Sequence, residues 1–306
     1  MDKRFPFVSI CTPTFNRRPF IQSLIYCYKN QNYPKDRMEW IVIDDGTDPV
    51  EDIFNLADIH NLRYIYLKEK ITLGKKRNLL NKYAKGKIIV NMDDDDYYPP
   101  SRVSHAVEIF LNNPYVMVAS SSLMYMYYTQ DNTIVSFGPY GKNHGTGATL
   151  AYRKEYAQLH KYSEVTSISE EKEFLNNYNT SVYQLNSMKT ILVIAHGKNT
   201  VDKDLLIAGN TNNKTVKRTN LKLEKFISQP FMVKFYKEMI NNIINNYKLG
   251  NLSEKPETKL ATKKIQERVR DSLGQSRGIY VNQNNRKKWL SEKEVIQILN
   301  NNYIEI

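Results

Sequence analysis

The sequence has little of what marks secreted, membrane-spanning or zinc-binding proteins. It contains only two cysteines in 306 residues, and no Cys/His spacing typical of a zinc site occurs. It has no run of about 18 apolar residues, the length that a membrane-spanning helix needs. Its N-terminus lacks the apolar stretch and the cleavage site of a signal peptide. We therefore expect a cytoplasmic protein in which Cys11 and Cys27, both in apolar segments, are buried and reduced.

The composition is that of a basic globular protein. Apolar residues make up 41% of the chain, enough for a real core, and 44 Lys and Arg against 32 Asp and Glu give a net charge of +12. This charge is compatible with a nucleic acid, an anionic membrane surface or a phosphate-bearing substrate. No segment resembles a nucleic-acid-binding motif, so we expect no nucleic-acid partner.

The first 112 residues alternate between short apolar runs and helical patterns. The runs are rich in β-branched residues, as in the buried strands of a parallel sheet. They comprise Val8–Ile10, Trp40–Ile43, Leu62–Leu67 and Ile88–Met92. Apolar residues at helical spacing predict helices over Pro19–Asn30, Leu73–Ala84 and Ser101–Asn112. The pattern indicates the α/β class, with a mainly parallel central sheet flanked by helices.

The rest of the chain changes character twice. It predicts a hairpin of Met117–Tyr128 and Thr133–Phe137, a Gly-rich loop at Gly138–Gly147, a short helix at Glu170–Tyr178 and a strand at Ile191–Ala195. From Leu223 it is basic and predicts helices over Phe226–Tyr247, Lys259–Leu273 and Ser291–Asn300. We expect a core domain of residues 1–222 and a basic helical extension of residues 223–306.

The role of that extension stays open between a solvated surface, an oligomer contact and a peripheral contact with a membrane. The apolar face that includes Ile227 and Met232 favours packing on the core. The basic cluster Arg286–Trp289 suits lipid headgroups.

Polar residues gather where three of the predicted strands end. Thr12–Arg17 follows the first strand, Asp44–Asp48 the second and Asp93–Asp96 the fourth. Ligands of an open parallel sheet bind at these carboxyl ends, and four adjacent carboxylates repel one another unless a cation or a solvated loop relieves them. Because hard divalent cations prefer oxygen ligands, the aspartate run predicts a metal site. The alternative is an acidic turn that caps the helix near Ser101.

These motifs occur in a characteristic order. Pro13–Arg17 is similar to a Pro-Thr-Tyr/Phe-Asn-Arg motif, and Asp44–Thr47 is similar to an Asp-Asp-Gly-Ser/Thr motif. Gly74, followed by Arg77 and Asn78, is similar to a Gly followed by Arg-Asn. Ala84, Gly86 and Lys87, which precede Asp93–Asp96, are similar to an Ala-x-Gly-Lys motif that leads into Asp-x-Asp-Asp. In this order the chain resembles the GT-A glycosyltransferases of family 2, which are inverting nucleotide-diphosphosugar transferases. Three later segments are also similar to the family, namely Gly145–Ala148 before Arg153, Glu170–Glu171 in place of a Glu-Asp pair, and His196–Thr200.

The resemblance implies a GT-A fold whose strand ends bind a nucleotide-sugar. Thr12 and Pro13 would lie against the base, and Asp44 and Asp45 would accept hydrogen bonds from base and ribose. The donor-binding residues expected from the resemblance are Thr12, Pro13, Thr14, Asn16, Arg17, Asp44, Asp45, Lys76, Arg77, Asp93, Asp94 and Gly147.

The resemblance also implies a divalent metal, Mn²⁺ or Mg²⁺. Asp95 is the first expected ligand, with Asp93 and His196 as further candidates. The metal would neutralise the charge that develops on the departing phosphates. The plainer interpretation of His196 is a buried, hydrogen-bonded histidine.

The expected general base is Glu171. Glu170 is the alternative, because the family has the shorter Asp where this chain has Glu171. It would take the proton of the acceptor hydroxyl. The plainer interpretation of the pair is an acidic first turn of a helix. The plainer interpretation of Asp44–Gly46 is a simple turn.

We therefore expect a metal-dependent, inverting glycosyltransferase that moves a sugar from a UDP-sugar to a hydroxyl of a glycan, a protein or a lipid. Two alternatives stay open. The unusual Glu170–Glu171 pair suits a degenerate module that binds nucleotide or glycan without turnover. A nucleotidyltransferase would usually carry a Gly-rich phosphate loop where this chain has Pro13–Asn16.

Overall fold

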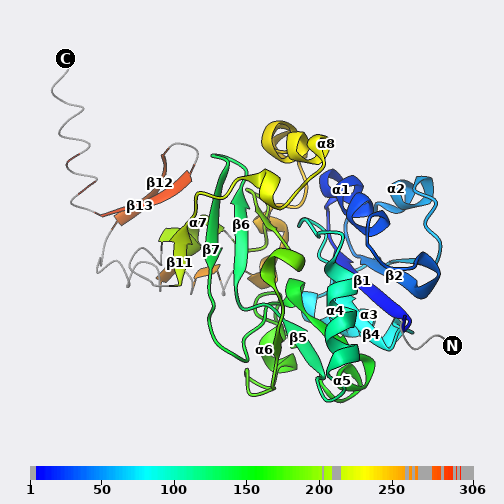
Figure 1. Cartoon of the computed structure of the whole chain (residues 1–306). Coiled ribbons are helices and arrows are strands. Elements are labelled where there is room, and N and C mark those ends of the chain that lie inside the picture. Colours follow the sequence, from blue (N-terminus) through cyan, green and yellow to red (C-terminus); the bar gives the residue numbers. More distant parts are fainter. Residues whose placement is uncertain are drawn as a thin grey trace.

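The computed structural model describes residues 5–201, 203–208 and 215–258, together with 262–263, 266–267, 278–283, 286–291, 294 and 297. Its centre is a seven-stranded sheet in the order β3-β2-β1-β4-β8-β5-β9 (Figure 1). These strands are β1 (Val8–Thr14), β2 (Met38–Asp44), β3 (Leu62–Tyr66), β4 (Ile88–Asn91), β5 (Val118–Ser120), β8 (Ala151–Arg153) and β9 (Tyr183–Gln184). The first four pair in parallel, and β8 joins β4 in antiparallel orientation. The predicted α/β class and parallel sheet are confirmed.

Helices connect and flank these strands. They are α1 (Arg18–Lys29), α2 (Glu51–Leu56), α3 (Leu73–Tyr83), α4 (Arg102–Asn112), α5 (Lys154–Leu159) and α6 (Glu171–Phe174). The helices predicted for α1, α3 and α4 are confirmed, whereas α2 was not predicted. The helix predicted to reach Tyr178 ends at Phe174, because Asn176, Asn177 and Tyr178 have positive φ angles that a right-handed helix cannot contain.

A second, four-stranded sheet has the order β10-β6-β7-β11. Its strands are β6 (Met124–Tyr128), β7 (Thr133–Phe137), β10 (Val193–Ala195) and β11 (Val216–Arg218). The predicted hairpin is confirmed as the antiparallel pair β6 and β7, with Asn132 in the left-handed conformation at the turn. The predicted run Met117–Tyr128 is divided, since β5 belongs to the first sheet and β6 to the second.

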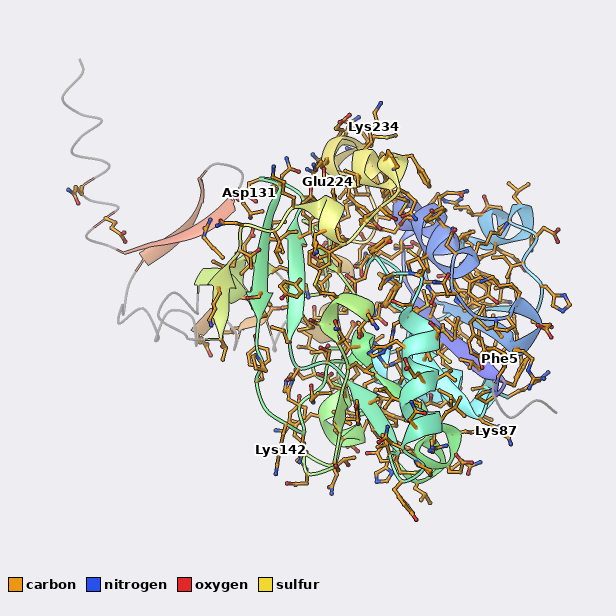
Figure 2. The ribbon with its side chains drawn as sticks, viewed as in Figure 1. Phe5, Lys87, Asp131, Lys142, Glu224 and Lys234 are labelled. Carbon is orange, nitrogen blue, oxygen red and sulfur yellow. The ribbon has the colours of Figure 1, made fainter. Side chains whose placement is uncertain are left out.

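The chain after this sheet packs back onto the core. Helix α7 (Lys203–Ala208) lies between β10 and β11 in the chain, and after β11 the chain forms α8 (Pro230–Lys234), a π-helical segment (Phe235–Met239) and α9 (Ile240–Asn246). Leu223, Ile227, Met232 and Tyr236 are buried within the main hydrophobic core. Lys234 of α8 and Glu224, in the short 3-10 helix Leu223–Lys225 before it, are exposed on the outer side of this region (Figure 2). The boundary predicted after residue 222 stays a prediction, but residues 223–258 are packed against the preceding part and not detached from it.

The C-terminal region is not wholly helical as we expected. Strands β12 (Gly278–Gln283) and β13 (Arg286–Ser291) form an antiparallel hairpin, so the basic cluster Arg286–Trp289 lies on a strand. The sequence of the cluster alternates poorly between apolar and polar residues, so strand periodicity gave no signal there. The helices predicted over Lys259–Leu273 and Ser291–Asn300 fall mostly outside the described residues, and Ser291 itself ends β13.

Burial of the central strands explains why they read as apolar runs. Every residue of β1, β2 and β4 is buried. Cys11 on β1 and Cys27 on α1 are buried free thiols, as predicted. No helix in the described ranges is both long and apolar enough to cross a membrane.

We predict that the C-terminal helices contribute to the cooperative stability of the core. Ile240 is fully buried against Phe20 of α1, whereas the adjacent Met239 is 46% exposed. Ile240→Ala should lower the free energy of unfolding by about 2–5 kcal/mol, and the control Met239→Ala should change it by less than about 0.5 kcal/mol. Urea unfolding measures both. Equal stability of the two variants would contradict this packing role.

Candidate active site

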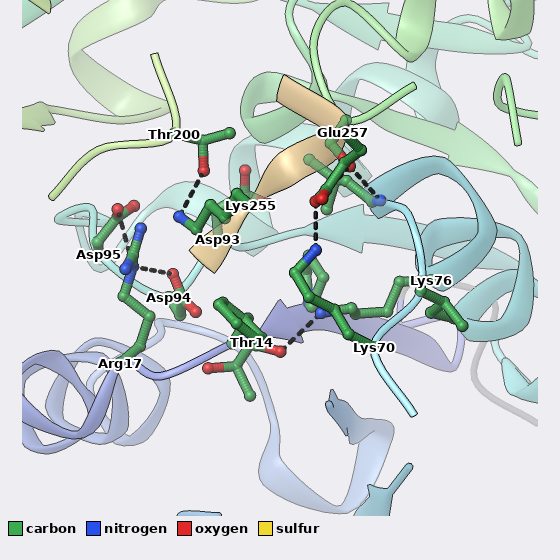
Figure 3. Close-up of a pocket in the computed structure, with 15 residues that line it drawn as sticks. Thr14, Arg17, Lys70, Lys76, Asp93, Asp94, Asp95, Thr200, Lys255 and Glu257 are labelled. Carbon is green, nitrogen blue, oxygen red and sulfur yellow. Dashed lines mark hydrogen bonds and ion pairs between the residues drawn. The ribbon is translucent and has the colours of Figure 1, made fainter. Parts of the chain in front are cut away.

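One pocket lies at the carboxyl ends of β1 and β4 (Figure 3). It combines residues from the start, the middle and the end of the described chain. Its lining comprises Pro13, Thr14, Phe15, Arg17, Lys70, Ile71, Leu73, Lys76, Asp93, Asp94, Asp95, Ser167, Thr200, Lys255 and Glu257. The predicted convergence of the first and fourth strand ends is therefore present in the structure.

Arg17 neutralises part of the aspartate run. Its Nε lies 3.3 Å from Asp95 Oδ2 and 3.6 Å from Asp94 Oδ1, and the Arg17 side chain is almost wholly buried. A further N–H of Arg17 donates to the carbonyl of Lys198 at 2.8 Å. Asn16, in a left-handed conformation with φ 51°, turns the chain so that Arg17 follows β1 into the site. Arg17 therefore joins β1, the aspartates and the segment after β10.

The aspartates divide into pocket residues and a structural residue. Asp93, Asp94 and Asp95 line the pocket, whereas Asp96 is buried and accepts a hydrogen bond from the backbone N–H of Ile194 at 2.9 Å. Burial and the neighbouring charge of Asp95 raise the pKa of Asp94 to about 7. Burial also favours the neutral form of Asp95, but the hydrogen bond from His196 and the charge of Arg17 outweigh it and lower the pKa of Asp95 well below its usual range.

Arg77 links Asp93 to the predicted general-base pair. Two of its N–H groups donate to the Asp93 carboxylate at 2.9 and 2.8 Å, and its Nε donates to Glu170 Oε1 at 2.8 Å. Although burial opposes the charged form, Asp93 and Glu170 raise the pKa of Arg77 well above its usual value. Gly147 packs against this bridge, and a Cβ there would lie 2.9 Å from both Arg77 and Glu170. Close packing of Arg77 thus explains the glycine, which does not itself line the pocket.

Glu171 is the first residue of α6 and follows Glu170 in the sequence, and both side chains are buried. Burial and the charge of Glu170 raise the pKa of Glu171 to about 8. Glu170 is engaged by Arg77, so the two glutamates have different environments. Which of them acts as a base stays a prediction.

Several residues predicted to touch the nucleotide have structural partners. Thr12 lies inside the core, where its hydroxyl donates to the Met92 carbonyl at 2.7 Å and accepts from Trp40 Nε1 at 2.9 Å. Asp44 accepts from the Tyr64 hydroxyl at 2.6 Å and also from the N–H groups of Gly46 and Val50. The structure therefore corrects the placement of Thr12 against the base and supports the interpretation of Asp44 as a turn-forming residue.

Asp45 lies behind the pocket wall and holds Lys76, which lines the pocket. They form a buried ion pair, and Lys76 Nζ also donates to the Thr14 carbonyl at 2.7 Å. Asp45 in turn accepts from the N–H of Ile71 at 2.9 Å. The pair joins the end of β1 to β2 and α3, so it positions the pocket whether or not Asp45 contacts a ligand.

His196 lies beside Asp95. Its Nε2 is 3.2 Å from Asp95 Oδ2, and its ring packs on Phe20 with centroids 4.5 Å apart. The backbone N–H of Lys198 points at its Nδ1 at 3.2 Å, which requires an unprotonated Nδ1. Burial lowers the pKa of His196 to about 4, so the imidazole is neutral at pH 7. The predicted neighbourhood of His196 and Asp95 is present, and the histidine is also buried and hydrogen-bonded.

The sequence analysis missed pocket residues that come from distant segments. Lys70 lies over the Phe15 ring, 4.9 Å from its centroid, and pairs with Glu257. Lys255 donates to the Thr200 hydroxyl at 3.0 Å. No sequence motif marks these residues, because their positions depend on how residues 250–258 fold back over the end of β1.

A comparison with protein families identifies the family of this chain. The model of glycosyl transferase family 2 matches residues 9–173, more than half of the chain. The chain belongs to glycosyl transferase family 2. The matched range contains β1, the aspartate run and Glu170–Glu171, but not residues 223–258. The predicted family is confirmed.

Two curated relatives are similar over part of their length. The Bacillus subtilis protein TuaG, named as a teichuronic acid biosynthesis glycosyltransferase, is 27% identical over 131 residues, which is 42% of this chain and 50% of TuaG. The Staphylococcus aureus poly(ribitol-phosphate) β-N-acetylglucosaminyltransferase TarS is 33% identical over 92 residues, which is 29% of this chain and 16% of TarS. The matches thus span half or less of these relatives.

Solved structures show the same fold. TarS residues 1–349 from S. aureus, in complex with UDP-GlcNAc, has a TM-score of 0.52 at 19% identity and covers 86% of this chain and 81% of that chain. The mannosyltransferase PcManGT from Pyrobaculum calidifontis, in complex with GDP-Man and Mn²⁺, has a TM-score of 0.53 at 14% identity and covers 88% and 74%. The predicted GT-A fold is confirmed.

We predict that the Arg77 bridge stabilises the site far more than a surface arginine does. Arg77→Met would leave the buried carboxylate of Glu170 and the partly buried one of Asp93 without their arginine partner and should lower the free energy of unfolding by about 3–5 kcal/mol. The control Arg18→Met removes half-exposed ion pairs with Asp48 and Asp52 and should cost less than about 1 kcal/mol. Urea unfolding at pH 7 compares them, and a similar cost for both variants would contradict the prediction.

Proposed function

We propose that this chain transfers a sugar from a UDP-sugar to a hydroxyl group, with inversion at the anomeric carbon and with the aid of a divalent metal. The observation that carries the proposal is the meeting of Pro13 and Phe15 with Asp93–Asp95 in one pocket. The first two offer an apolar surface to a base, and the aspartates offer ligands to a metal beside the diphosphate. Family membership and the UDP-GlcNAc complex of TarS support a nucleotide-sugar donor linked to UDP.

The donor chemistry of the site fits a hard divalent cation. Within the described ranges no three His, Cys, Asp or Glu side chains already converge as a complete metal site. Asp95 nevertheless offers a carboxylate oxygen, a ligand type that Mn²⁺ accepts, and His196 Nε2, 3.2 Å from it, would become a second ligand on giving up the proton that it donates to Asp95. We propose Asp95 and His196, with Asp93, as the residues that would hold Mn²⁺ or Mg²⁺. The cation would supply positive charge to the departing diphosphate.

Glu171 suits the role of general base better than Glu170. A base is most effective when its pKa lies near the working pH, and the pKa of Glu171 is raised to about 8. Glu170 Oε1 is held by Arg77, which favours a positioning role. In the proposed reaction the acceptor oxygen forms a bond to the anomeric carbon, the bond from that carbon to the phosphate oxygen breaks, and Glu171 takes the acceptor proton.

The metal-dependent donor site can be tested by thermal unfolding with UDP, GDP, CDP and dTDP, each with and without Mn²⁺. UDP with Mn²⁺ should raise the melting temperature, since a ligand at a hundred times its Kd stabilises the native state by about 2.7 kcal/mol. Asp95→Asn should lose the metal-dependent part of the shift, and the control Asp36→Asn, at an exposed position, should keep it. A larger shift with another nucleotide would reassign the donor. No shift with any nucleotide would contradict the transferase proposal.

The proposed base predicts a pH dependence of transfer. Glu171 accepts a proton only when ionised, so kcat/KM should rise with pH through about 8 and fall tenfold per pH unit well below that value. Glu171→Gln should lower kcat by about 10²- to 10⁴-fold while the UDP-induced melting shift remains. Full transfer by Glu171→Gln together with loss in Glu170→Gln would show that Glu170 is the base. Nucleotide binding without any wild-type transfer would favour the degenerate module.

A further inference from the structure

Lys255 differs from the other cations of the pocket. Its Nζ donates to the neutral hydroxyl of Thr200 at 3.0 Å. In the part of the chain that the structure describes, no carboxylate lies within 4.0 Å of this ammonium group. The remaining pocket cations have carboxylate partners: Arg17 with Asp94 and Asp95, Lys70 with Glu257, and Lys76 with Asp45.

Lys255 is buried, so the lack of a carboxylate partner among the described residues lowers the stability of the folded state. Lys255 is only 5% exposed, and a buried charge without an ionic partner destabilises the folded state. Burial, with the like charge of Arg17, lowers the pKa of Lys255 to about 7. An anionic ligand in the pocket would supply an ionic partner that none of the described residues provides within 4.0 Å.

The flanking residues hold Lys255 in this place. Glu254 Oε2 accepts from Asn16 Nδ2 at 2.8 Å, and Glu257 pairs with Lys70 and accepts from Ser167 Oγ at 3.3 Å. The segment is thus anchored on both sides of Lys255, to the end of β1 and to the loop before α3. Figure 3 shows Lys255 between Thr200 and the aspartates.

We propose that Lys255 binds the diphosphate of the nucleotide-sugar through an ion pair. This assignment rests on the proposed transferase function and lies outside the range matched by the family model. When the bond between the anomeric carbon and the phosphate oxygen breaks, its electron pair stays on that oxygen. The ammonium of Lys255 stabilises the negative charge that the leaving nucleoside diphosphate then carries.

The test compares a charged ligand with an uncharged one. Calorimetry measures the binding of UDP and of uridine, both with Mn²⁺. The proteins compared are the wild type, Lys255→Met, Lys255→Arg and the control Lys248→Met. The control changes an exposed lysine close to Lys255 in the sequence. Lys255→Met should bind UDP about 10- to 100-fold more weakly, as expected for loss of a charge-assisted hydrogen bond. Its affinity for uridine should stay within about twofold of the wild type, Lys255→Arg should recover part of the loss, and Lys248→Met should match the wild type.

The outcomes separate this inference from the function on which it rests. Unchanged UDP affinity in Lys255→Met would overturn the assignment of Lys255 alone. Equal weakening of UDP and uridine would also overturn it, because it would show that Lys255 only holds the segment in place. Failure of the wild type to bind any of the four nucleoside diphosphates would overturn the proposed function as well.

Discussion

The acidic end of β4 is the constraint on which the site depends. Four consecutive carboxylates follow a buried strand, and their repulsion in a medium of low polarity would destabilise the fold if nothing opposed it. The protein opposes it with different groups for each residue. Arg77 holds Asp93, Arg17 lies between Asp94 and Asp95, and a backbone N–H holds Asp96. The site is therefore assembled by charge neutralisation as much as by apolar packing.

This neutralisation connects segments that are far apart in the sequence. Arg17 follows β1, Arg77 belongs to α3 and His196 follows β10, yet all three contact the aspartates. Arg77 extends the connection to Glu170, directly before α6, so Asp93 and the neighbour of the proposed base share one guanidinium group. A shift of that group would disturb both.

The local sequence predicted the strands that are buried on both faces and the helices that bury one apolar face. Strands β1, β2 and β4 are buried on both faces and therefore read as apolar runs, and α1 and α4 each bury a mainly apolar face. The motifs placed Arg17, Arg77 and the aspartates correctly in one region. Thr12 was misplaced because a motif does not show whether a side chain faces the core or the pocket. Lys255 was missed because only the folded chain brings residues 250–258 over Phe15.

The charge balance of the pocket determines how the binding of one ligand would affect the binding of the other. Four cationic and four acidic side chains line it, namely Arg17, Lys70, Lys76 and Lys255 against Asp93, Asp94, Asp95 and Glu257. With the lining formally balanced, a nucleoside diphosphate alone would add negative charge beside three aspartates, and a divalent cation alone would add positive charge beside Arg17 and Lys255. The two together largely cancel. Each should therefore strengthen the binding of the other, which is the reciprocity that linkage requires of two ligands sharing one site.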